Sequence, residues 1–73
     1  MDKKEADRLI TEYYKKFFGF ALSKTGSADR AEELASRITL EVYTTLLKRE
    51  NIVNVDGYIY RIAEHVWARF AAD

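Results

Sequence analysis

The sequence GYIYRIAEHVWARFAAD, residues 57–73, predicts an amphipathic helix. Its apolar side chains recur at spacings of three and four, which places them on one face of a helix. They are Ile59, Ile62, Ala63, Val66 and Phe70. Three side chains at i, i+4 and i+8 border this apolar face, and we call them the cationic strip: Arg61, His65 and Arg69.

The flanks of this helix allow two interpretations. In the first, the arginines extend over the edge of a core, while Tyr60 and Trp67, on the opposite flank, pack at its rim with their polar atoms in water. In the second, exposed aromatic rings stack on the bases of a single-stranded nucleic acid and the arginines contact its phosphates, which contributes about 1–3 kcal/mol per stacked base. The pattern alone leaves both interpretations open.

A further helix is predicted over residues 3–24. The chain has no proline and only three glycines, which favours helix throughout. Gly26 is expected to end this first helix, because glycine readily adopts the left-handed conformation of a helix C-cap. The apolar stripe of the helix comprises Leu9, Ile10, Tyr13, Tyr14, Phe17, Phe18, Ala21 and Leu22.

The middle helix is expected to begin near Ser27 or Asp29, since Asp29 and Glu32 have the D-x-x-E form of a capping box. Its apolar stripe comprises Ala31, Leu34, Ala35, Ile38, Val42 and Leu46. A polar connector over residues 50–54 follows, and Asn54 or Asp56 is expected to cap the last helix. Three helices with short links predict an all-α three-helix bundle, a single domain over residues 1–73.

The first helix carries more aromatic surface than one face can bury, because Phe20 adds to the aromatic residues of its stripe. One explanation is that the bundle wraps this helix on two sides. The other is that part of this aromatic surface faces a partner or a second copy of the chain.

The outer face of the middle helix contains Glu33, Arg37, Leu40, Glu41 and Thr44. Glu33 with Arg37, and Arg37 with Glu41, are expected to form i, i+4 ion pairs that need no partner molecule. A solvated face is therefore the simpler interpretation, although Leu40 offers an apolar spot for docking.

Composition bounds the function classes. Twelve basic and twelve acidic residues cancel, which argues against general polyanion binding but not against a local basic patch. The single histidine, the absence of cysteine and the absence of a glycine-rich phosphate loop argue against an enzyme, a metal site or a cofactor. There is no signal-peptide pattern and no membrane-span pattern, so we expect a soluble cytoplasmic domain with no membrane partner.

Two stretches resemble region 2 of bacterial RNA polymerase sigma factors, specifically the small extracytoplasmic-function group. Residues 18–47, FGFALSKTGSADRAEELASRITLEVYTTLL, are similar to the family's helical hairpin, with its L-x-x-T-G and A-E-D/E-L signatures. Residues 57–70, GYIYRIAEHVWARF, are similar to its A-W-L-Y-R-I-A-x-N segment. The resemblance covers about three fifths of the chain and implies a sigma region 2 type of three-helix bundle.

The resemblance implies a function in transcription initiation. The middle helix of this family docks on the clamp helices of the largest subunit of core RNA polymerase, which here assigns docking to Glu33, Ser36, Arg37 and Leu40. The connector and the last helix capture and melt the minus-ten element of promoter DNA and flip a base out of the stack. This assigns DNA contact to Lys48, Arg49, Asn51, Tyr60, Arg61, His65 and Arg69. An anti-sigma factor is a further partner that the resemblance implies.

The sequence departs from the family at several of these positions. Ser36, Arg37 and Thr39 stand where L-x-Q-E/D-x-F is usual, so a charge is reversed on the expected docking face. His65 replaces a typical asparagine and Arg69 a frequent aspartate. The family's second domain, which reads the minus-thirty-five element, is absent from these residues, so the chain is either an excised domain or a stand-alone relative. The alternative function is a small helical protein-interaction module that keeps a sigma-like fold without DNA binding.

Overall fold

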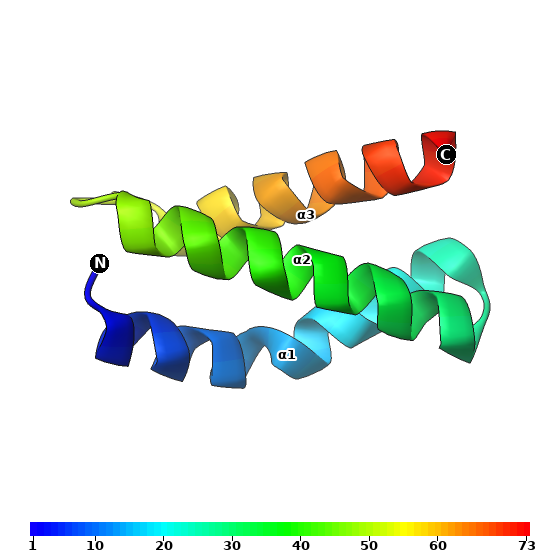
Figure 1. Cartoon of the computed structure of the whole chain (residues 1–73), viewed down its shortest axis with the longest axis horizontal. Coiled ribbons are helices and arrows are strands. Elements are labelled where there is room, and N and C mark those ends of the chain that lie inside the picture. Colours follow the sequence, from blue (N-terminus) through cyan, green and yellow to red (C-terminus); the bar gives the residue numbers. More distant parts are fainter.

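The computed structural model describes all residues from 1 to 73 and contains three α-helices and no strand. The helices are α1 (Lys3–Thr25), α2 (Ala28–Lys48) and α3 (Val55–Ala72). In Figure 1, α2 lies between the other two helices and runs antiparallel to both, while α1 and α3 run in the same direction. The predicted all-α three-helix bundle is therefore confirmed.

Local side-chain chemistry explains where the helices begin and end. Asp2 caps α1 by accepting a hydrogen bond from the backbone N–H of Glu5. Gly26 ends α1 as predicted, since it has a φ of 67° and its N–H donates to the carbonyl of Leu22. Ser27 caps α2, so the predicted capping box at Asp29 is wrong: Asp29 already lies in the first helical turn.

The predicted stripes of α2 and α3 form most of the core. All six predicted residues of α2 are fully buried, and the five predicted residues of α3 are no more than 8% exposed. The α2 stripe is completely covered because α2 packs against both neighbours. The helical spacing of the apolar residues therefore identified the buried faces of these two helices correctly.

Helix α1 differs, because it packs mainly on α2 and has few contacts with α3. Its buried residues are Ala6, Phe17 and Ala21. Two residues of its predicted stripe are exposed, Tyr14 and Leu22. The bundle therefore covers α1 mainly from the side of α2, with a few contacts from α3, and a row of aromatic side chains remains partly accessible.

Candidate nucleic-acid interface

The connector between α2 and α3, residues 49–54, is held by hydrogen bonds at both ends. The N–H of Arg49 donates to the carbonyls of Thr45 and Leu46 at the end of α2. Asn54 caps α3, and its Oδ1 accepts a hydrogen bond of 3.1 Å from the N–H of Gly57. Between them, Asn51 has a φ of 57°, a left-handed conformation that asparagine tolerates better than most residues.

Gly57 leaves room for this cap. A Cβ atom at position 57 would lie 2.7 Å from Nδ2 of Asn54, which is closer than two such atoms can approach. A larger residue would therefore push Asn54 away from the first turn of α3. The glycine keeps the connector close to the helix that follows it.

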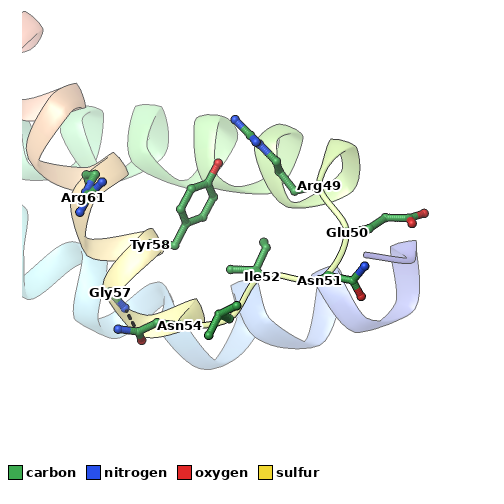
Figure 2. A pocket seen from close by; sticks show the side chains of 9 residues that line it. Arg49, Glu50, Asn51, Ile52, Asn54, Gly57, Tyr58 and Arg61 are labelled. Atoms are coloured by element: carbon green, nitrogen blue, oxygen red, sulfur yellow. Dashed lines mark hydrogen bonds between the residues drawn. The ribbon is translucent and has the colours of Figure 1, made fainter.

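An open pocket of about 380 Å³ lies between the connector and the first two turns of α3. We call it the connector pocket, and Figure 2 shows the side chains that surround it. Its lining residues are Arg49, Glu50, Asn51, Ile52, Val53, Asn54, Gly57, Tyr58 and Arg61. The structure thus brings three predicted DNA-contact residues together: Arg49, Asn51 and Arg61.

The centre of the connector pocket is aromatic and its edges are cationic. The ring of Tyr58 is half-buried, and the guanidinium carbon of Arg49 lies 5.9 Å from the ring centre. Arg49 and Arg61 form no ion pair within the chain, so both guanidinium groups remain available to an anion. A planar ring between two free guanidinium groups can stack on a base and bind adjacent phosphates.

The first turns of α1 support the connector end of the molecule. The amino group of Met1 donates a hydrogen bond to the carbonyl of Arg49. Lys3 forms an ion pair with Asp7 at 3.0 Å. A hydrogen bond from the Tyr43 hydroxyl, together with Lys3, lowers the pKa of Asp7, and the same hydrogen bond raises the pKa of Tyr43. These contacts join the start of α1 to the last turns of α2, directly before the connector.

The three residues of the cationic strip of α3 have different neighbours. Arg61 lines the connector pocket, and His65 is exposed further along α3. Arg69 is paired with Glu41 of α2, with 2.5 Å between Nη2 and Oε1. The three residues therefore do not form one continuous free surface.

The remaining two predicted DNA-contact residues, Tyr60 and Lys48, also lie outside the connector pocket, as His65 and Arg69 do. Tyr60 points into a groove between α1 and α3, where its ring meets the ring of Phe20 edge-on at 5.9 Å. Lys48, the last residue of α2, is exposed but does not line the pocket. The aromatic residue that lines the pocket together with Arg49 and Arg61 is instead Tyr58.

Sequence reasoning missed Tyr58 as a candidate. The signal that could have found it is its position one turn before Arg61, within the turn that the connector leads into. The interpretation of the last helix considered its apolar face and its cationic strip, and Tyr58 belongs to neither.

The predicted docking residues share an exposed surface of α2, which we call the docking face. Its members are Glu33, Ser36, Arg37 and Leu40. Leu40 is 65% exposed and is the most exposed large hydrophobic side chain on the helices. Single exposed apolar side chains are common on protein surfaces, so the docking assignment rests on the resemblance and not on this exposure.

Arg37 is bound within the chain from two directions. It forms the predicted ion pair with Glu33 at 3.6 Å and a second one with Asp73 at 3.8 Å. Its guanidinium also lies 5.1 Å from the ring centre of Phe70. The predicted pair of Arg37 with Glu41 is wrong, because Glu41 pairs with Arg69 of the neighbouring helix.

None of the three helices has a stretch that is both long and apolar enough to cross a membrane. No cluster of three or more histidine, aspartate or glutamate side chains is arranged to hold a metal ion. Comparison of the chain with protein-family models, with curated proteins and with solved structures gives no match.

Proposed function

We propose that this chain is a sigma-factor region 2 domain of the extracytoplasmic-function group, which binds core RNA polymerase and recognises and melts the minus-ten promoter element. The observation that carries the proposal is the connector pocket, with Tyr58 between the free guanidinium groups of Arg49 and Arg61. This pocket is formed by the connector that joins the two stretches resembling the family, residues 18–47 and 57–70, and by the first residues of the second stretch. The resemblance assigns base capture to the same segment.

The pocket supports capture of an unpaired base in the following way. A base that leaves the stack of the duplex packs against the ring of Tyr58. Arg61 and Arg49 bind the phosphates on either side. Binding the unpaired base favours the melted state, because the base pair cannot re-form while the base is held.

The docking face supplies the second half of the proposed function. Leu40 packs against the clamp helices of the largest polymerase subunit, and Glu33 and Ser36 contact polar groups around it. Polymerase then holds the domain at the promoter, which compensates for a chain whose net charge is zero. The proposed activity is binding rather than catalysis, and it belongs to the cytoplasm, where polymerase works.

A selection experiment with core polymerase tests the proposal. The domain is immobilised, saturated with core polymerase and presented with a random-sequence library of single-stranded DNA, with polymerase alone as the control. We expect enrichment of a short motif that depends on Arg61, so that Arg61→Ala loses it and the matched variant Arg8→Ala on α1 keeps it. Failure to retain polymerase, or polymerase retention without any enriched motif, would contradict the proposal.

The second candidate is a helical protein-interaction module with a sigma-like fold and no DNA binding. One observation favours it, namely that Arg69 of the cationic strip is already neutralised by Glu41. In the same experiment this candidate predicts that polymerase is retained through Leu40 while no DNA motif is enriched. Leu40→Glu is expected to abolish retention of polymerase under both proposals. Only the presence or absence of an enriched DNA motif therefore distinguishes the two functions.

A further inference from the structure

A second depression, the aromatic groove, lies between α1 and α3 and has a volume of about 430 Å³. It exists because α1 and α3 both pack on α2 and have few contacts with each other. Six of its eight lining residues are hydrophobic. The lining residues are Tyr13, Lys16, Phe17, Phe20, Asp56, Ile59, Tyr60 and Ala63.

The groove has incompletely covered aromatic side chains. Phe20 and Tyr13 of α1 are half-buried, and Tyr60 of α3 is 55% exposed. The two rims meet in the edge-on contact of Phe20 with Tyr60. Covering these rings would remove apolar surface from water, which favours association by about 25 cal/mol per Å² before the costs of association are subtracted.

The two rims of the groove carry opposite charges. Lys16 lies on the α1 rim with its ammonium 4.9 Å from the ring centre of Tyr13, and Asp56 lies on the α3 rim in the first turn of that helix. Neither side chain forms an ion pair within the chain. Each lies four residues before one of the rings in the Phe20–Tyr60 contact, and α1 and α3 run in the same direction, so the two lie at about the same level along the helices.

We propose that the aromatic groove binds a second copy of this chain, so that two chains form a symmetric dimer. Because α1 and α3 run in the same direction (Figure 1), a two-fold axis along the groove places α3 of one copy beside α1 of the other without reversing either helix. Asp56 of each copy then faces Lys16 of the other, which gives two equivalent ion pairs. Tyr60 of each copy enters the groove of its neighbour.

The charge pattern favours a second copy over an unrelated partner. A partner helix with an acidic edge would be attracted to Lys16 but repelled by Asp56. A partner helix with a basic edge would be attracted to Asp56 but repelled by Lys16. A copy of the chain presents both charges in the required order, and a net charge of zero adds no overall repulsion between copies. The groove shares no residue with the docking face or the connector pocket, so the dimer does not depend on the proposed function.

The test is the mass of the chain in solution as a function of concentration. Sedimentation equilibrium from about 10 µM to about 1 mM is expected to show a reversible rise in mass by mass action. The limiting mass is twice the 8.5 kDa of one chain. Lys16→Glu and Asp56→Lys are each expected to weaken the dimer at least about tenfold, since each places like charges opposite one another. The combined variant Lys16→Glu/Asp56→Lys restores the opposite-charge pairs and therefore the dimer.

Matched variants separate a specific interface from a general effect of charge. Lys15→Glu and Asp29→Lys make the same changes at exposed positions outside the groove, one in α1 and one in the first turn of α2, and are expected to leave the dimer intact. Circular dichroism confirms that each variant is folded. A chain that stays monomeric at every concentration overturns the proposal, whether or not its groove then binds a foreign peptide or an oligonucleotide. Single variants that weaken the dimer without rescue by the combined variant also overturn it.

Discussion

Arg61 and Arg69 lie about two turns apart in the cationic strip of α3, yet the bundle gives them different surroundings. Arg61 lines the connector pocket near Tyr58 and has no acidic partner, whereas Arg69 is paired with Glu41 of α2. Both are exposed arginines on the same helix. The difference shows that a neighbouring helix decides whether a guanidinium is free to bind a phosphate or is already neutralised.

The largest expected effect comes from removing the aromatic ring at the Arg61 end. Tyr58→Ala is expected to lower affinity for the selected oligonucleotide, in the presence of core polymerase, by about 10- to 100-fold, because it removes a stacked base worth about 1–3 kcal/mol. Fluorescence anisotropy of the labelled oligonucleotide measures this change. Trp67→Ala, near the Arg69 end of α3, is the matched control and is expected to have little effect. If both variants lost the same oligonucleotide affinity, the Arg61 end of α3 would not be the preferred binding site.

Replacing Arg61 and Arg69 in turn tests whether only Arg61 is free to bind a phosphate. Arg61→Ala is expected to weaken oligonucleotide binding about tenfold, or about 1.4 kcal/mol, because it removes a phosphate contact. The dependence of log affinity on log salt concentration is expected to become shallower by about 0.7, the value for one phosphate of a single strand. Arg69→Ala is expected to change neither quantity, because Glu41 already occupies this guanidinium. If both variants changed the salt dependence of affinity equally, Arg69 would also contact a phosphate, which would contradict its neutralisation by Glu41.

Freeing Arg69 from its ion pair with Glu41 is expected to change oligonucleotide affinity by less, and to raise it. Glu41→Gln removes the carboxylate that pairs with Arg69 and is expected to raise oligonucleotide affinity about threefold, while unfolding free energy falls by less than about 1 kcal/mol because the pair is largely exposed. Titration at low and high salt measures the gain, which should disappear at high salt. Glu5→Gln removes a carboxylate that pairs with Arg8 on α1, outside the docking face and the connector pocket, and serves as the control. A gain that persists when Glu41→Gln is combined with Arg69→Ala would show that the effect does not pass through Arg69.

The smallest expected effect concerns the support beneath the connector end. The Tyr43 hydroxyl and Lys3 lower the pKa of Asp7 below its ordinary value of 3.8, so ionised Asp7 favours the folded state. This stabilisation is present above the ordinary pKa and is lost as pH falls through the lowered one. Thermal unfolding followed by circular dichroism between about pH 2 and pH 6 is expected to show a slightly steeper acid loss for the wild type than for Asp7→Asn. Identical acid dependence in the two proteins would remove this role of Asp7.

Most of the fold could be predicted because two helices have unambiguous stripes. In α2 and α3 the apolar residues recur at one helical face, and packing against neighbours buries these faces. On α1 the prediction was wrong only for Tyr14 and Leu22, because aromatic and apolar residues occur around much of this helix. Whether Tyr14 or Phe17 is buried depends on where α3 lies, which the sequence of α1 does not contain.

The candidate site was predicted in part. The sequence indicated Arg49, Asn51 and Arg61, and the structure brings these three to one pocket. It did not indicate Tyr58, and it grouped Arg69 with Arg61 although the two have different neighbours. Helical periodicity describes each helix alone, so it cannot report a contact that another helix makes.

The sequence by itself determined the three helices, the end of the first helix at Gly26, and the buried stripes of α2 and α3. These depend on backbone preferences and on apolar spacing, which act over a few residues. Only the tertiary structure decided the pairing of Arg69 with Glu41, the position of Tyr58 beside two free guanidinium groups and the open groove between α1 and α3. Those features depend on which surfaces of different helices meet, because charge neutralisation and burial are set by the distances between them.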